Sequence, residues 1–291
     1  VNSKCSALAV KTCEFSNYLM NKKMCNLRCF YKTFFKVCYK RRFMGVKKNL
    51  ELIGQYWLLM ERVFTKPEKW CIFRKQYVTE AYKLIIDSLP IVSIISIFIG
   101  AVIVLQTAYN LENPFIPKMY VGYMARESLV LEFCSTMVAL ILAGKIGSNI
   151  ASEIGSMRIT EQIDAMEIMG VNSANYLILP KIASATTLSP FVMLASFMIG
   201  LLGGALIVIF TGVINLGQYI DGIQFAFKPY YVYYSMTKMA VFAFIITSVS
   251  SFYGYYAKGG SLGVGRSSTK AIVISSGLIL VFNLLITKIM L

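Results

Sequence analysis

The chain has 291 residues, of which 57% are hydrophobic and 15% charged, and its mean hydropathy is +0.63. A chain this apolar is not an ordinary soluble domain, and its composition indicates an integral membrane protein. The formal net charge of +15 does not indicate nucleic-acid binding, because residues 1–48 hold twelve Lys or Arg residues and one acidic residue, Glu14. The rest of the chain is nearly balanced, so nucleic acid is not an expected partner.

The basic segment 1–43 also contains five of the seven cysteines. Cys25 and Cys29 are close in sequence, but the chain has no His and no second ligand pair with zinc-site spacing, so no metal site is expected. Two interpretations stay open for this tail: a disordered basic arm at an anionic membrane surface, or sequence upstream of a translation start at Met44. The abrupt change of composition at Met44 favours the second, and we assign no function before it.

The segment 44–88 is amphipathic, with apolar positions recurring beside charged ones. Trp57, Trp70 and Tyr77 are suitable interfacial anchors, so we expect an elbow along the cytoplasmic membrane surface, broken at Pro67. A soluble helix packed on a neighbouring domain is the alternative. It is less favoured because no soluble domain follows in the sequence.

Five apolar runs are long enough to cross about 30 Å of hydrocarbon. They lie at 89–109, 129–150, 182–213, 232–257 and 271–291. Continuous apolar runs indicate helices rather than barrel strands, so the predicted fold is all-α. The third run is longer than one crossing needs and contains Pro190, which predicts a tilt, a kink or a start before the membrane.

Orientation follows from the positive charges of the short loops. The segment before the first run and the loop between the fourth and fifth runs, with Lys258, Arg266 and Lys270, are the most basic. Both are therefore predicted to be cytoplasmic, which places the C-terminus on the opposite side.

The polar segment 143–170 interrupts two apolar stretches. Residues 158–169 are predicted to form a short amphipathic helix, with Glu161, Asp164 and Glu167 on one face beside Gln162. Gly144, Gly147 and Gly155 allow close helix approach as the chain leaves the second run. Such a helix would rest on the membrane domain and present carboxylates to a partner; the alternative is a loop helix whose charges are merely solvated.

Several motifs closely resemble landmarks of the MlaE family of ABC-transporter permeases, in family order over 44–291. The most specific is the stretch 147–171, and the others are Arg126-Glu127, Leu179-Pro180-Lys181, Thr237-Lys238 and the glycines of 259–265. The resemblance implies a homodimer of elbow-plus-five-helix subunits in the bacterial inner membrane. A cytoplasmic ATPase that uses ATP and Mg²⁺, and a periplasmic MCE-domain lipid-binding protein, would be its partners in moving phospholipid between the two membranes.

The resemblance also implies roles for individual residues. The coupling helix to the ATPase would lie at about 153–170, with contacts from Glu153, Arg158, Glu161, Gln162, Asp164 and Glu167. The expected lipid pathway includes Val102, Leu105, Gln106, Tyr109 and Lys238. Structural or gating roles are expected for Arg126, Glu127, Glu132, Lys145, Gly147 and Gly155.

The sequence departs from the family pattern at two charged positions. Lys145 stands where Arg is frequent, which keeps the charge but loses bidentate geometry. Glu132 is an added charge at the start of a span, where pairing with Arg126 or Lys118 and exposure to a wet cavity are the alternatives. Lys238 either snorkels to an interface or meets a phosphate headgroup.

Enzyme chemistry is poorly supported. The stretch 260–267 nearly spells a P-loop, but Arg266 replaces the phosphate-binding Lys and no strand precedes it, so a tight turn between helices is favoured. The chain has no His and no nucleophile-elbow motif, so we expect a non-catalytic subunit without a cofactor of its own. A secondary transporter or channel is the alternative function, less favoured because the span interiors are nearly free of charge.

Overall fold

The computed structural model describes residues 51–65, 70–111, 115 and 117–290. The chain divides into two units, Val1–Trp57 and Leu58–Leu291. In the first unit the described residues, 51–57, are helical. The predictions for the tail 1–43 and for residues 44–50 fall outside the described residues.

The second unit is built of helices, and no strand occurs among the residues described. After helical residues 58–63 come α3 (Trp70–Leu84), the short turn η1 (Ile86–Ser88) and α4 (Leu89–Asn110). A continuous helical stretch then runs through α5 (Met119–Ser128), η2 (Leu129–Met137), α6 (Val138–Leu142), η3 (Ala143–Gly147) and α7 (Ser148–Ile159). The remaining elements are α8 (Gln162–Ile168), α9 (Ser173–Thr211), α10 (Leu216–Gln224), α11 (Pro229–Tyr255) and α12 (Gly260–Met290).

In the described part of the chain, five helical stretches are long and apolar enough to span a membrane, which confirms the predicted all-α membrane fold. Their bounds are Trp70–Asn110, Met119–Ile159, Ser173–Thr211, Pro229–Tyr255 and Gly260–Met290. The third has 39 residues, about 58 Å of helix at roughly 1.5 Å per residue, so it is almost twice as long as the hydrocarbon is thick. It begins well before the predicted apolar run, as the sequence allowed.

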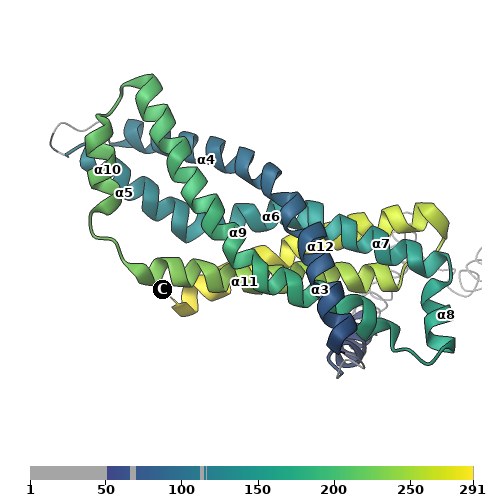
Figure 1. Ribbon diagram of the computed structural model, residues 1–291. Helices are drawn as coiled ribbons and strands as arrows, with labels where there is room; N and C mark the ends of the chain where they lie inside the picture. Colours follow the sequence, from purple (N-terminus) through teal and green to yellow (C-terminus); the bar gives the residue numbers. More distant parts are fainter. Residues whose placement is uncertain (1–50, 66–69, 112–114, 116, 291) are drawn as a thin grey trace, which may run out of the picture. The chain divides into compact units, whose positions relative to one another are not determined.

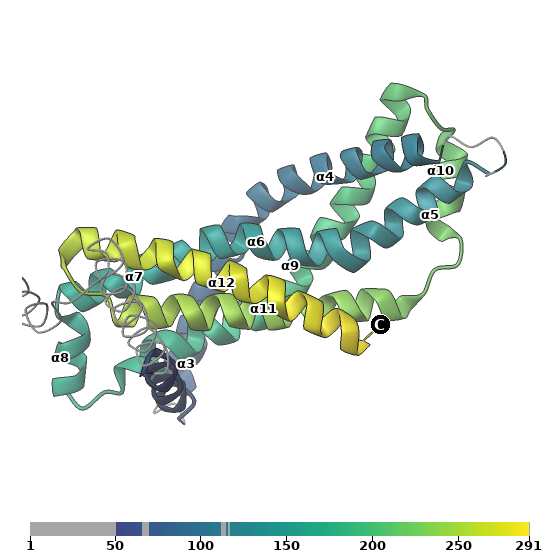
Figure 2. The ribbon, with the colours of Figure 1, turned by 180° about the vertical axis from the view of Figure 1, so that it is seen from behind.

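Helix α11 is at the centre of this unit, where it packs against α9, α12 and α7. Figures 1 and 2 show α8 at one end of the helical body and α10 at the other, with α12 running beside α11. Only 11% of the most apolar stretch of α12 is buried, against 61% for α11. One long face of α12 is therefore available to lipid or to another chain.

Two small residues set the crossing of α4 and α9. A side chain at Gly100 would overlap the backbone carbonyl of Gly200, and one at Gly203 would overlap the backbone of Ile97. Ser96 and Ser196 share a hydrogen bond of 2.7 Å at the same contact. Because Gly100 and Gly203 have no side chain, the backbones of α4 and α9 can approach closely.

We therefore expect Gly100→Ala to lower the thermal stability of the detergent-purified protein, because rigid backbone rather than a flexible side chain opposes the added methyl group. The cost should be about 1–3 kcal/mol, the usual range for overpacking. Gly277→Ala is the matched control, since nothing lies within 4 Å of its added carbon. Equal melting temperatures for the two variants would contradict the assigned crossing.

Candidate functional site

The polar segment is two helices rather than one. The predicted single helix over 158–169 is wrong in its bounds, because α7 ends at Ile159 and α8 begins at Gln162. Between them Glu161 adopts a left-handed backbone conformation with φ of 57°. No Gly or Pro marks this turn in the sequence, which is why the helical pattern appeared continuous.

The inner side of α8 is fixed by specific contacts. The side chain of Ile163 is fully buried. Asp164 accepts a hydrogen bond of 2.5 Å from Arg158, and Glu167 accepts bonds of 2.8 Å from Tyr255 and 3.0 Å from Ser173. Two of the three carboxylates predicted to face a partner are therefore engaged within the chain.

Glu167 is exposed, but its carboxylate is held in place by its hydrogen bonds to Tyr255 and Ser173. The hydrogen bond from the Tyr255 hydroxyl lowers the pKa of the Glu167 carboxyl below its ordinary value, although desolvation acts in the opposite direction. The Ser173 hydrogen bond and the positive charges of Arg158 and Arg62 lower this pKa further. The carboxylate is thus held in its charged form at neutral pH.

The outer side of α8 is open. Glu161 and Gln162 are exposed at its start, and at its end the side chains of Ile168 and Met169 are 88% and 72% exposed. Large apolar side chains this exposed, on a short helix anchored from behind, are typical of a surface that a partner covers. We call these four residues the α8 surface.

Glu153, a predicted coupling residue, lies in an ion cluster that joins three helices. Its carboxylate is 2.9 Å from Lys181 of α9 and 2.9 Å from Lys83 of α3. Lys181 is only 3% exposed and also pairs with Glu80 of α3 at 2.7 Å. The cluster ties α7 to α3 and to the start of α9.

At the other end of this unit, Arg126 of α5 closes the end of α10. The guanidinium is 2% exposed and donates hydrogen bonds to the carbonyls of Ile223 (2.6 Å) and Phe225 (2.9 Å), and to Glu127 (2.5 Å). It also lies 5.5 Å from the centre of the Phe227 ring. These contacts fix the chain that follows α10.

A second charged group lies within the spans. Lys238 of α11 is fully buried and its ammonium is 3.0 Å from Glu132 of η2. Asn283 of α12 donates to the same carboxylate at 3.0 Å, and Thr136 donates at 3.2 Å. Glu132 therefore pairs with Lys238 and not with Arg126 or Lys118, and Lys238 does not snorkel to an interface. The Glu132 side chain is still 44% exposed, so one side of this group faces outward between η2 and α12.

The structure does not bring the other predicted site residues together at one site. Val102, Gln106 and Tyr109 are exposed on α4 and Leu105 is half-buried, whereas Lys238 contacts η2 and α12. Lys145 donates to the backbone carbonyl of Asp87. Gly147 and Gly155 lie at close contacts with Ser250 of α11 and Val264 of α12, while Gly144 faces open space.

Comparison with known proteins identifies the family of this chain. Residues 77–289 match the model of the family described as Permease MlaE. The chain belongs to the MlaE permease family. The resemblance inferred from the sequence is thereby confirmed.

Relatives of this MlaE-family chain are themselves permeases by name. A probable ABC transporter permease protein of Rickettsia bellii is 37% identical over 69% of this chain and 77% of its own length. A probable ABC transporter permease protein of Synechocystis is 30% identical over 70% of this chain and 77% of its own length. The intermembrane phospholipid transport system permease protein MlaE of Haemophilus influenzae is 27% identical over 80% of this chain and 89% of its own length.

Sequence reasoning missed part of this MlaE-family site. It placed Lys181 in a landmark motif without assigning partners, and it did not single out Glu80 or Asn283. Asn283 had a usable signal, since an amide inside the apolar run 271–291 needs a hydrogen-bonding partner. Glu80 had none, because nothing in its neighbourhood indicates a contact with a residue about a hundred positions away.

Proposed function

We propose that this chain is the membrane subunit of an ATP-driven transporter that moves phospholipid between the inner and outer membranes of a bacterial cell. It would act as a homodimer, with a cytoplasmic ATPase at α8 and a periplasmic MCE-domain protein near α10. Membership of a family of ABC-transporter permeases and the name of the Haemophilus influenzae relative support this proposal.

The α8 surface is the observation on which the ATPase contact depends. Arg158, Tyr255 and Ser173 hold α8 in place through hydrogen bonds to its carboxylates, so the helix has a defined position for a partner. Its outer side offers Ile168 and Met169 with Glu161 and Gln162 around them. An apolar centre with a polar rim suits a protein groove.

The ion cluster provides a route from this contact to the spans. A force on α8 reaches α7 through the turn at Thr160 and Glu161, and α7 is bonded through Glu153 to α3 and α9. Lipid would then pass along a path that includes the outward side of the Glu132–Lys238 group, where a charged group can contact a headgroup beside apolar walls. The residues of α4 stay candidates for its outer mouth.

The test introduces charge into the α8 surface. Ile168→Glu with Met169→Glu should reduce the ATPase recovered with the purified permease at least about tenfold, because hot-spot residues are each worth roughly 2 kcal/mol. These positions are preferable to Asp164, whose reversal would also break the Arg158 contact. The amount of co-purified ATPase is measured by quantitative mass spectrometry, after checking that the permease is inserted and folded.

Leu216→Glu with Ile220→Glu is the matched control, since both residues are partly exposed on α10 at the opposite end. This control should retain the ATPase. Wild-type recovery of ATPase with the α8 variant would overturn the assigned contact. Lipid or solute transport by the chain without any ATPase would favour the secondary transporter or channel instead.

A further inference from the structure

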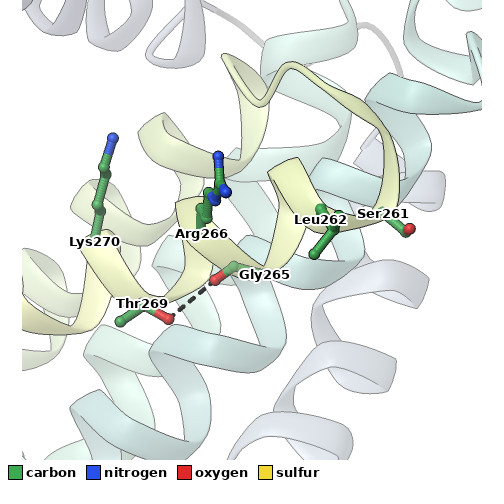
Figure 3. Close-up of a pocket in the computed structure, with 6 residues that line it drawn as sticks. All are labelled: Ser261, Leu262, Gly265, Arg266, Thr269 and Lys270. Carbon is green, nitrogen blue, oxygen red and sulfur yellow. Dashed lines mark hydrogen bonds between the residues drawn. The ribbon is translucent and has the colours of Figure 1, made fainter.

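A basic hollow lies at the start of α12, outside the contacts assigned so far. It has a volume of about 600 Å³, and Figure 3 shows the side chains around it. Its lining residues are Ser261, Leu262, Gly265, Arg266, Thr269 and Lys270. This is the stretch whose sequence nearly spells a P-loop, but here it is the first turns of a long apolar helix.

Among the described residues, the two cations of this hollow have no acidic partner. Arg266 and Lys270 are exposed, and neither forms an ion pair within the part of the chain that the structure describes. They are four residues apart on one helix, so their charges share a face and repel each other. Lys181 and Lys238, by contrast, are buried against carboxylates. An anion seated between Arg266 and Lys270 would relieve this repulsion.

The position of the hollow along α12 suits a lipid headgroup. The apolar run begins at Ala271, directly after Lys270, so the cations lie where hydrocarbon gives way to headgroups. Below them the same helix exposes Val273 (65%) and Leu280 (55%), which offer an apolar track for acyl chains. The long side chains of Arg266 and Lys270 have the reach to hold their charges at the interface.

We propose that this hollow binds the phosphate headgroup of an anionic phospholipid in the leaflet at the start of α12. The proposed function places the start of α12 on the cytoplasmic side, so the leaflet is the cytoplasmic one. This choice of leaflet rests on the proposed function. Arg266 would donate a forked pair of hydrogen bonds to phosphate oxygens and Lys270 a point charge. Thr269 donates its hydroxyl proton to the Gly265 carbonyl (3.0 Å), so it offers lone pairs rather than a proton, and Ser261 is the other hydroxyl in the lining.

The experiment measures lipid binding to the purified, delipidated full chain by native mass spectrometry, using phosphatidylglycerol and phosphatidylcholine with the same acyl chains. Wild type should bind phosphatidylglycerol more tightly. Arg266→Gln with Lys270→Gln should weaken that binding about 10- to 30-fold, as expected for two basic residues at a lipid surface. Lys258→Gln with Lys288→Gln is the control, because it removes the same charge from exposed positions outside the hollow. It should change the affinity for phosphatidylglycerol less than about twofold.

Three results would overturn the proposal. Unchanged phosphatidylglycerol binding by the hollow variant, or equal binding of the two lipids by wild type, would show that the cations do not recognise a charged headgroup. Displacement of the lipid by millimolar inorganic phosphate would assign the hollow to a free phosphate. A dimer that the hollow variant abolishes while lipid binding persists would assign it to a second copy of the chain.

This measurement needs neither the ATPase nor transport. A negative result therefore leaves the permease proposal standing. Conversely, loss of the α8 contact leaves headgroup binding untouched, so the two proposals fail separately.

Discussion

Replacing Lys181 by methionine is expected to lower the free energy of unfolding by about 3 kcal/mol, the lower end of the range for breaking a buried ion pair. Lys181 is the buried cation between Glu80 and Glu153, so its loss leaves two carboxylates close together. Both are partly exposed, 17% and 21%, which moderates the cost. The measurement is the shift of thermal unfolding in detergent, followed by helical circular dichroism.

Lys83→Met is the matched control, because it removes the other cation of the cluster. Lys83 is 45% exposed and makes one ion pair, so its loss should cost less than about 1 kcal/mol. Equal shifts for the two variants would show that Lys181 is not the central cation. A shift for Lys181→Met close to zero would show that the cluster does not join α3, α7 and α9 in solution.

The fold could largely be predicted from the sequence, because the thickness of the bilayer sets a minimum length for every span. Five apolar runs gave five spans, and glycines at Gly147 and Gly155 indicated close helix contacts that the structure contains. The ends of the spans were harder to predict from the sequence. Helices such as α9 extend beyond the apolar run, since helix continuity depends on backbone hydrogen bonds and packing rather than on hydropathy.

The charged residues of the site were recognised individually, but not their partners. Glu132 was noticed as an unusual charge, yet its pairing with Lys238, 106 residues away, depends on how η2, α11 and α12 pack. The stripe of acids on 158–169 predicted an amphipathic surface, but the sequence did not indicate that Asp164 pairs with Arg158 and Glu167 with Tyr255 and Ser173. Tertiary contacts therefore determine which charges are free for a partner, and the sequence pattern does not contain that information.

Removing one charge of the Glu132–Lys238 pair should be as costly as removing Lys181. Lys238→Met leaves a carboxylate among apolar spans, and Glu132→Gln leaves a fully buried ammonium, so each change is expected to cost about 3 kcal/mol. The double variant removes both charges together and should recover most of that stability, because a neutral pair avoids the desolvation cost. Thermal unfolding of all four proteins completes a double-mutant cycle, and two single costs of about 3 kcal/mol with a double-variant cost of about 1 kcal/mol give an expected coupling of about 5 kcal/mol.

Lipid transfer by the same four proteins, reconstituted with their ATPase, separates a structural role from a transport role. The carboxylate of Glu132 has four hydrogen-bonding partners among the described residues, yet its side chain remains 44% exposed, and a purely structural pair inside a span does not need this exposure. The double variant should therefore be stable but still transfer lipid at least about tenfold more slowly, the loss expected when a charged contact to a headgroup is removed. Transfer at the wild-type rate by the stable double variant would assign the pair to folding alone and move the lipid path away from η2 and α12.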